Sequence, residues 1–254
     1  ENLVNQHFIN SYTEKYEEFK NHVKNLDMNE LETLTGVSKA KVKKAAIAYA
    51  SAERAMEFHG LGVTEHYQGS KTVMLLSNLA MMTGNIGKNG VGLNPLRGQN
   101  NVQGAADMGV QPHQGAGYLD VSQPDIQQYY AEKYGIEKMP ESDGLKVPEM
   151  LDAAINGKLK ALYIMGEDTI MTDPNTNHSI KAFEKLDFIV VQELFMTATS
   201  EMADVVLPAS SYFEKNGTFT NGERRMQRVN KVIEPIGNTK PDGQIIIDIM
   251  SRLE

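Results

Sequence analysis

Three short apolar segments that alternate with helical patterns constrain the fold of this 254-residue chain more than any other feature. The segments are ALYIMG (161–166), FIVVQ (188–192) and ADVVLP (203–208). Pro148 opens a helix that runs to Ala154, and a further helix is predicted from His178 to Leu186. Continuous apolar strands between helices are typical of parallel sheets that are covered on both faces. The sequence therefore predicts an α/β fold built on parallel strands.

Acidic and amide residues follow the first two of these strands. The segment 166–168 (Gly-Glu-Asp) follows the first strand, and 192–193 (Gln-Glu) follows the second. In open parallel sheets, ligands bind outside the carboxyl ends of the strands. Carboxylates there can accept hydrogen bonds from ribose hydroxyls, or from N1–H and the exocyclic amine of guanine. Helix capping by Asp168, or by Thr172 and Asp173, explains the same residues equally well.

The stretch Thr83–Gly109 (TGNIGKNGVGLNPLRGQNNVQGAADMG) is rich in glycine and amide side chains and poor in apolar ones. Its glycines allow tight turns and a close approach to another molecule. One interpretation is a long polar surface loop. Loops of this length inside compact domains are uncommon and are usually functional or disordered, which favours a functional loop.

The residues before this stretch predict an α/β unit. An aromatic stripe predicts an amphipathic helix over 8–25, and Ser38 is expected to cap a longer helix. The remaining elements are a short helix at 29–34, a buried strand at 55–63 and an apolar helix at 70–82 that Gly84 ends. This order of elements is expected to deliver the Gly-rich stretch from the edge of the unit.

The other segments are a connection, a hairpin and a final helix. Residues 110–147 are read as a connection with one short helix, DIQQYYAEKYG (125–135), and the chain finishes with the helix GQIIIDIMSRLE. In 216–234, two Gly-containing turns and the cluster of Arg224, Arg225 and Arg228 allow two interpretations. The cluster holds an anionic partner, or it belongs to a surface hairpin with ordinary ion pairs.

Composition excludes several classes of function. A formal charge of −8 argues against nucleic-acid or anionic-membrane surfaces, because both need a basic footprint. There is no apolar run of about 18 residues and no signal-peptide pattern, so no membrane span is predicted. The expected location is the cytoplasm. With no cysteine, the chain supplies no thiolate ligand, and its six histidines lack metal-ligand spacing. No metal ligand is predicted.

Five separated blocks of sequence resemble a known family. They are GLGVTEHYQG (60–69), LAMMTGNIGKNGVGLNPLRGQNNVQGAADMG (79–109), YIMGED (163–168), VVQELFMTATSEMADVVLPASSYFEKNGTFTNGERRMQRV (190–229) and KPDGQII (240–246). In this order they resemble the central region of the catalytic subunit of molybdenum or tungsten formate dehydrogenases, within the molybdopterin oxidoreductase family. The resemblance covers most of the chain, although Gly243 stands where the family frequently has an aromatic residue.

The resemblance implies Rossmann-like parallel-sheet domains, a bis(molybdopterin guanine dinucleotide) cofactor carrying Mo or W, and oxidation of formate to carbon dioxide. It places Arg97 as the substrate arginine, and a planar guanidinium can hold a carboxylate through two hydrogen bonds. Gln99 would contact the pterin near the metal. Together with the strand-edge argument, it gives a set of expected cofactor-binding residues: Leu61, Glu65, Gln99, Gly166, Glu167, Asp168, Thr172, Gln192 and Glu193.

The resemblance also implies that the chain is a fragment. The family's N-terminal iron–sulfur segment, which holds a 4Fe-4S cluster, its metal-ligating Cys or selenocysteine and its C-terminal domain have no counterpart here. We therefore expect no activity from the chain alone. The expected parts are 1–99, ending in the Gly-rich loop, 100–211, binding the guanine dinucleotide, and 212–254, a tail that belongs to a further domain.

The expected partners are formate, an electron-transfer subunit or domain, and the remainder of the same polypeptide. Two alternatives stay open. The chain is a non-catalytic relative that binds a nucleotide or serves assembly, or it belongs to another molybdopterin oxidoreductase with a different small substrate. Arg97 discriminates between the enzyme and the non-catalytic relative, because a non-catalytic relative has no need of a carboxylate-binding arginine. Substrate profiling would reveal a different small substrate.

Overall fold

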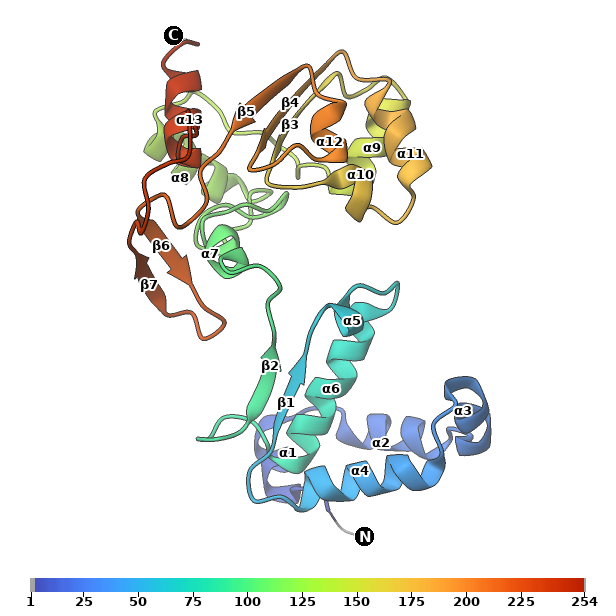
Figure 1. Cartoon of the computed structure of the whole chain (residues 1–254). Helices are drawn as coiled ribbons and strands as arrows, with labels where there is room; N and C mark the ends of the chain where they lie inside the picture. The colour runs from blue at the N-terminus through green and yellow to red at the C-terminus, as the bar shows by residue number, and fades with distance from the viewer. Residues whose placement is uncertain (1–2, 254) are drawn as a thin grey trace. The chain divides into compact units, whose positions relative to one another are not determined.

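The computed structural model describes residues 3–253, whose contacts form two compact units. Unit 1 is Glu1–Asn100 and unit 2 is Asn101–Glu254. Figure 1 labels the helices and strands of both units.

Unit 1 contains six helices and two strands among its described residues. The helices are α1 (Gln6–Tyr12), α2 (Tyr16–Lys24), α3 (Met28–Thr35), α4 (Lys39–Ser51), α5 (Leu61–Thr64) and α6 (Gly69–Thr83). The strands are β1 (Met56–His59) and β2 (Gly92–Pro95). The Ser38 side chain caps α4, and Gly84 ends α6 in the left-handed conformation with φ 68°. The predicted helices at 29–34, after Ser38 and at 70–82 are confirmed.

Three predictions for the N-terminal half are wrong in detail. The helix expected over 8–25 is two helices, because Lys15 has φ 57° and interrupts the helical backbone. The strand expected over 55–63 is only β1, in which His59 alone is buried. The Gly-rich stretch is not a structureless loop, since it contains β2 and α7 (Val102–Asp107).

Strands β1 and β2 pair in parallel, from Met56 opposite Gly92 to His59 opposite Pro95. The pairing continues one residue further, because the Leu96 N–H donates to the His59 carbonyl at 2.7 Å. The segment 97–99 therefore emerges at the carboxyl end of a parallel strand pair. The Gly-rich stretch was expected to leave from the edge of the unit, and it instead contributes β2 to this strand pair.

A shielded phenol and carboxyl group connect α4 with β1. The Tyr49 hydroxyl and both carboxylate oxygens of Glu57 are closed off from solvent. Burial raises the pKa of Tyr49 to about 12, and the neighbouring Glu57 carboxylate adds to this increase. The folded unit therefore favours the neutral, protonated form of the Tyr49 phenol.

Unit 2 is built around a three-stranded parallel sheet in the order β3-β4-β5. Its strands are β3 (Ala161–Met165), β4 (Phe188–Glu193) and β5 (Val205–Pro208). Around the sheet lie α9 (Val147–Ile155), α10 (Thr169–Thr172), α11 (Thr176–Phe183) and α12 (Ala198–Glu201). The predicted α/β fold with parallel strands is confirmed in this unit.

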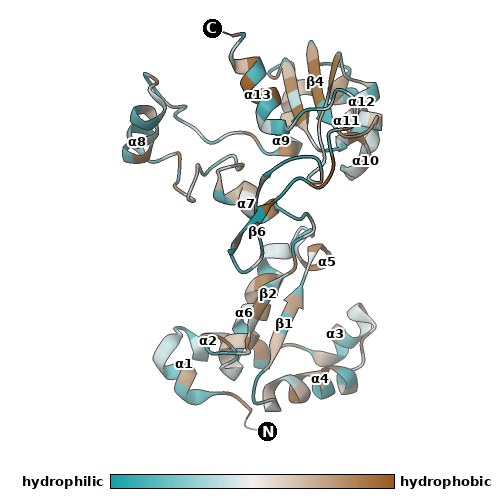
Figure 2. Cartoon of the chain, turned by 60° about the vertical axis from the view of Figure 1, so that its left-hand side comes forward, coloured by the Kyte–Doolittle hydropathy of each residue, from teal (hydrophilic) through white to brown (hydrophobic). Residues whose placement is uncertain are grey.

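The core of unit 2 lies between one face of this sheet and the helices. Leu151 from α9 and Phe183 from α11 are almost fully buried against Ile164, Ile189 and Val191 from the strands. Figure 2 shows the apolar residues that run along β4. Truncating a buried Leu or Phe to Ala typically costs about 2–5 kcal/mol, so this layer fixes the sheet in place.

Besides α7, the remaining elements of unit 2 are a helix in the connection, a hairpin and the final helix. They are α8 (Pro124–Tyr134), the antiparallel pair β6 (Gly217–Thr220) and β7 (Met226–Val229), and α13 (Asp242–Met250). Strands β6 and β7 form the hairpin that one of the two interpretations expected. Arg224 lies over the Tyr118 ring, 5.2 Å from its centroid, and Arg228 Nε donates to Asn230.

The raised pKa of Tyr49 predicts a pH-dependent stability. A phenol whose pKa rises from about 10 unfolded to about 12 folded stabilises the fold below about pH 10, and this contribution is lost as the pH rises through 12. We expect the free energy of unfolding to fall between about pH 10 and 12, and to fall less in Tyr49→Phe. Urea unfolding followed by circular dichroism at several pH values measures this. Tyr67→Phe, which alters a fully exposed phenol, is the control, and parallel pH profiles for all three proteins would contradict the assignment.

Candidate functional site

The turn after β3 is tied to the end of β4. Gly166 has φ 65°, a conformation that favours glycine, and its N–H donates to the Gln192 carbonyl at 2.9 Å. No atom lies within 4 Å of the position that a Cβ would take at Gly166, so the space beside it is open. The two turns predicted to share one edge of the sheet are therefore joined by a backbone hydrogen bond.

Asp168 bridges this turn to α12. Its Oδ1 accepts from the Thr199 N–H at 3.1 Å and from the Thr199 hydroxyl at 2.7 Å. Thr199 is fully buried, and its Oγ1 also accepts from the Ile170 N–H at 3.0 Å. Asp168 stands at the N-cap position of α10, yet its side chain makes no capping bond there. Capping of α10 therefore does not account for this carboxylate.

Glu167, Thr172 and Glu193 complete the acidic edge. The Thr172 hydroxyl donates to the Glu167 carboxylate and contacts the Asp168 carbonyl at 3.1 Å. Glu193 is half-buried, and its Oε1 accepts from the Leu194 N–H at 2.6 Å. Within the described part of the chain, neither Asp168 Oδ2 nor Glu193 Oε2 accepts a hydrogen bond. Both oxygens can accept from a ligand at this edge.

Gln192 lies in a buried polar network. Its side chain is fully buried, its Oε1 accepts from the Tyr163 hydroxyl, and its Nε2 donates to Asp242 Oδ1 at 2.8 Å. Asp242 Oδ2 in turn accepts from Lys215. Burial and the Asp242 charge raise the pKa of Tyr163, so its hydroxyl stays protonated as the donor. Sequence reasoning found Gln192 but missed its two side-chain partners, because Tyr163 and Asp242 lie 29 and 50 positions away in the chain.

Unit 1 brings together a second group of the expected residues. Leu61 begins the helical turn α5 directly after β1, and Glu65 follows the turn with its N–H bonded to the Leu61 carbonyl at 2.8 Å. A Cβ placed on Gly98 would lie 3.6 Å from Leu61 Cδ1, so α5 and the segment 97–99 are neighbours. Arg97 and Gln99 are exposed. Both groups thus lie at the carboxyl ends of parallel strands, one in each unit.

Comparison with known proteins identifies the family. Residues 8–252 match the molybdopterin oxidoreductase family. The chain belongs to this family.

Two relatives of this molybdopterin oxidoreductase chain have names that state an activity. It is 44% identical over 253 residues to formate dehydrogenase H of Escherichia coli, covering 100% of this chain and 35% of the relative. It is 45% identical over 254 residues to the F420-dependent formate dehydrogenase subunit alpha of Methanocaldococcus jannaschii, covering 37% of that protein. The chain therefore spans about a third of the length of these relatives.

A solved structure confirms the fold of this molybdopterin oxidoreductase region. Acetylene hydratase from Pelobacter acetylenicus superposes with a TM-score of 0.72 over 98% of this chain and 37% of its own. The sequences are 18% identical, so this likeness bears on the fold alone.

Two features are absent from residues 3–253. No group of three or more His, Asp or Glu side chains in this range is arranged to hold a metal ion. No helix in the same range has the length and apolar character to cross a bilayer.

The two neighbouring acids of the edge should differ in their effect on stability. Asp168→Ala leaves the buried Thr199 N–H and hydroxyl without their acceptor, which should lower the free energy of unfolding by about 1–3 kcal/mol. Glu167→Ala removes only an exposed contact with Thr172, and its effect should stay below about 0.5 kcal/mol. Urea unfolding followed by circular dichroism compares the two variants. Equal losses would show that the Asp168 bridge does not stabilise the unit.

Proposed function

We propose that this chain is part of the catalytic subunit of a formate dehydrogenase, which oxidises formate to carbon dioxide and binds bis(molybdopterin guanine dinucleotide). The observation that carries the proposal is the similarity to formate dehydrogenases at 44–45% identity over essentially the whole chain. Since the chain covers about a third of those relatives, the activity of the intact protein is inferred from them.

Arg97 is proposed as the substrate arginine. It directly follows the pairing of β1 with β2, and the Leu96–His59 hydrogen bond fixes the backbone before it. Its side chain is exposed, and the residues around it provide little apolar cover. A bidentate guanidinium–carboxylate pair would orient formate, which loses one proton and two electrons to become carbon dioxide.

The acidic edge of unit 2 fits a guanosine. The guanine N1–H, its exocyclic amine and the ribose hydroxyls are donors, and Asp168 Oδ2 and Glu193 Oε2 are acceptors without a partner in the described residues. Gly166 leaves open space beside them. We propose that Asp168 and Glu193 hold the base and the ribose, with Glu167 and Thr172 at the rim.

Gln192 is less suited than its neighbours to a direct side-chain contact with guanosine. Both ends of its amide are engaged, by Tyr163 and by Asp242, and the side chain is fully buried. We propose that Gln192 mainly holds the edge in shape and that its backbone, rather than its amide, lies next to the ligand. This differs from the role that the family resemblance implies.

When bound, the metal–pterin group would supply the redox chemistry by accepting the electrons that formate loses. The residues of this chain would bind and orient: Leu61, Glu65, Gln99 and Arg97 from unit 1, and the acidic edge from unit 2. An iron–sulfur cluster, a Cys or selenocysteine ligand and an electron-transfer subunit are proposed for the parts of the intact protein outside this chain.

Another molybdopterin oxidoreductase activity is the second candidate. The structural likeness to acetylene hydratase makes the point that this fold is not restricted to formate dehydrogenases. The identities of 44–45% to formate dehydrogenases favour the first candidate. A non-catalytic relative is less consistent with an exposed arginine at the end of β2.

Replacing Arg97 tests the proposed role. In the full-length subunit, Arg97→Lys should lower kcat/KM for formate on the order of a hundredfold, since lysine is a point charge without the planar fork. Bound metal and pterin, measured by elemental analysis and fluorescence of the released pterin, should not change. Arg54→Lys, an exposed arginine elsewhere in unit 1, is the control. Turnover that survives Arg97→Lys would remove this residue from the proposed mechanism.

The isolated 254-residue chain should be inactive. It contains no cysteine for a thiolate ligand or a cluster, so formate-dependent reduction of a viologen dye should stay at the level of a no-enzyme blank. The full-length subunit, assayed in parallel, should reduce the dye. Reduction by the isolated chain above the blank would refute the proposal that catalysis needs the rest of the subunit.

A further inference from the structure

Four asparagines of this chain are followed directly by glycine: Asn89, Asn156, Asn216 and Asn221. An asparagine amide is lost without an enzyme when the backbone nitrogen of the next residue attacks the side-chain carbonyl carbon, Cγ. A glycine in that next position favours the attack, because it has no Cβ to hinder the approach and its backbone reaches conformations closed to other residues. The rate then depends on whether the amide and the attacking nitrogen are held in place.

Hydrogen bonds of the folded chain hold the side chains of two of these asparagines. Asn221 Oδ1 accepts from the Glu223 and Arg225 N–H groups, both at 3.0 Å. Asn216 Oδ1 accepts from the Lys231 N–H at 2.9 Å. Either amide must give up these bonds before its Cγ can turn toward the following nitrogen, which raises the barrier to the reaction.

The third asparagine, Asn156, is restrained through the nitrogen that follows it. The Gly157 N–H donates to the Ala154 carbonyl at 3.0 Å, in the turn at the end of α9. A nitrogen that is engaged in this way has to leave its acceptor before it can attack. The fold therefore protects three of the four asparagines, by two different means.

Asn89 and Gly90 have neither form of protection. Among residues 3–253, the Asn89 amide makes no hydrogen bond and the Gly90 N–H donates none. Both residues are exposed, in the turn between α6 and β2. Gly90 has φ 79°, a conformation that favours glycine, so this turn depends on the residue that also exposes the nitrogen.

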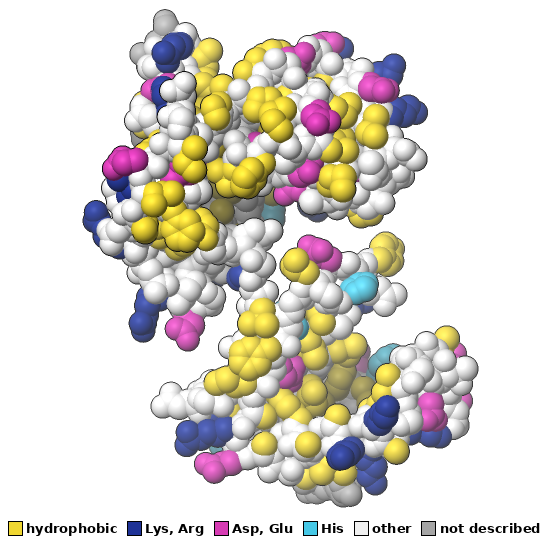
Figure 3. Space-filling view, in the orientation of Figure 1, with side chains coloured by type: hydrophobic (Ala, Val, Ile, Leu, Met, Phe, Trp, Pro, Cys, Tyr) yellow, Lys and Arg dark blue, Asp and Glu magenta, His cyan; other side chains and the backbone are white. Residues whose placement is uncertain are grey.

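Two basic side chains lie next to this turn. Lys88 directly precedes Asn89, and its Nζ donates to the Glu53 carbonyl at 3.5 Å. A Cβ built on Gly90 would lie 3.1 Å from Arg54 Cδ and 3.8 Å from Arg54 Nη1. Figure 3 shows basic side chains on the visible surface of unit 1. The attack passes through a negatively charged Gly90 nitrogen and an oxyanion on Cγ, and nearby positive charge stabilises both.

We propose that Asn89 is a site of spontaneous deamidation. The Gly90 nitrogen loses its proton to water and bonds to Asn89 Cγ. The Cγ–Nδ2 bond then breaks, and Nδ2 leaves as ammonia with a proton taken from water, which leaves a succinimide ring. Water next adds to one of the two ring carbonyl carbons. Opening of the ring at Cγ gives aspartate, and opening at the main-chain carbonyl carbon gives isoaspartate. No oxidant or reductant takes part.

The isoaspartate product changes the backbone close to β2. Its chain runs through Cβ and Cγ, which adds one methylene group to the backbone shortly before the strand begins at Gly92. The pairing of β1 with β2 is short, and it ends with the hydrogen bond from the Leu96 N–H to the His59 carbonyl. We expect the added length to loosen this pairing.

Ageing of the full-length subunit tests the proposal. The protein is kept at neutral pH for several weeks and digested, and its peptides are quantified by mass spectrometry, with electron-transfer fragmentation to tell aspartate from isoaspartate. Deamidation at Asn89 should be at least about tenfold faster than at Asn221, where two hydrogen bonds must first break. A rate at Asn89 no higher than at the other three asparagines would overturn the proposal.

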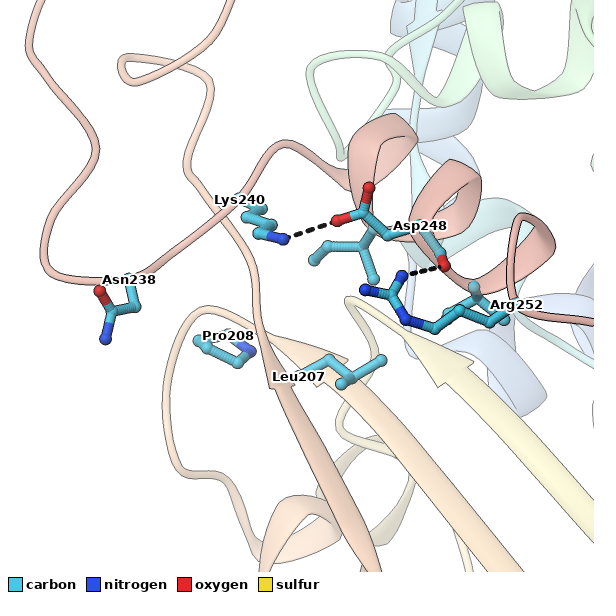
Figure 4. Close-up of a pocket in the computed structure, with 8 residues that line it drawn as sticks. Leu207, Pro208, Asn238, Lys240, Asp248 and Arg252 are labelled. Carbon is cyan, nitrogen blue, oxygen red and sulfur yellow. Dashed lines mark hydrogen bonds and ion pairs between the residues drawn. The ribbon is translucent and has the colours of Figure 1, made fainter.

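Asn238 is an internal control for the role of glycine. It is exposed, and Figure 4 shows its side chain apart from the other residues drawn, with no dashed line to any of them. The next residue is Thr239, whose branched Cβ hinders the approach of the nitrogen. Asn238 should therefore stay intact. Deamidation of Asn238 as fast as that of Asn89 would show that exposure, rather than the Gly90 nitrogen, sets the rate.

Two further variants of the full-length subunit test the effect of charge. Arg54→Gln should slow the deamidation of Asn89 about threefold, because it removes a positive charge beside the attacking nitrogen. Lys71→Gln, which alters an exposed lysine on α6, should leave the rate unchanged. Equal rates in the two variants would remove Arg54 from the proposal.

Hydrogen exchange measures the structural consequence. The modified subunit carries an additional carboxylate, so anion exchange separates it from the unmodified form. Amide exchange in residues 92–96 should be several-fold faster in the isoaspartate form, whereas exchange in β4 should be the same in both forms. Equal exchange in 92–96 would overturn the loosening of β2. These measurements do not involve formate, so their outcome is independent of the proposed function.

Discussion

The parallel alignment of β3, β4 and β5 is the constraint on which unit 2 depends. Parallel strands run in one direction, so the turns that follow β3 and β4 must meet at the same edge of the sheet. The layer of Leu151 and Phe183 beneath the strands holds this alignment, because close-packed side chains resist displacement. The acidic edge is a consequence of the sheet, and its position would be lost with the register.

Polar groups at the edge are held by other protein groups before any ligand is present. Thr199 fixes Asp168, while Tyr163 and Asp242 fix Gln192. Buried polar groups without partners are costly, so these bonds restrict the side chains to one arrangement. Binding of a ligand here costs little conformational entropy, because these side chains are already ordered. This favours affinity and geometric specificity. What the edge can bind is determined by the carboxylate oxygens that accept no hydrogen bond within the described residues, rather than by the whole set of acidic residues.

Some of the sequence predictions were wrong because local patterns do not record backbone breaks or distant pairing. The aromatic stripe over residues 8–25 continues through Lys15, although the left-handed backbone there separates α1 from α2. Strand β2 contains few strand-forming residues, and it is a strand because β1 pairs with it. The Gly-rich stretch was therefore correctly predicted as polar and turn-rich, but its strand and its helix α7 could not be predicted from its composition.

The sequence by itself determined the three strands of the sheet, the caps of several helices, the presence of acidic residues after β3 and β4, and the family. These features are encoded locally, by runs of apolar residues, by capping side chains and by contiguous motifs. Only the tertiary structure decided that Asp168 bonds to Thr199 and that Gln192 is enclosed by Tyr163 and Asp242. Residues 29 to 50 positions apart meet in those contacts. Which of these residues meet depends on how the sheet and the helices pack. Packing brings together segments whose local sequences give no indication of their contact.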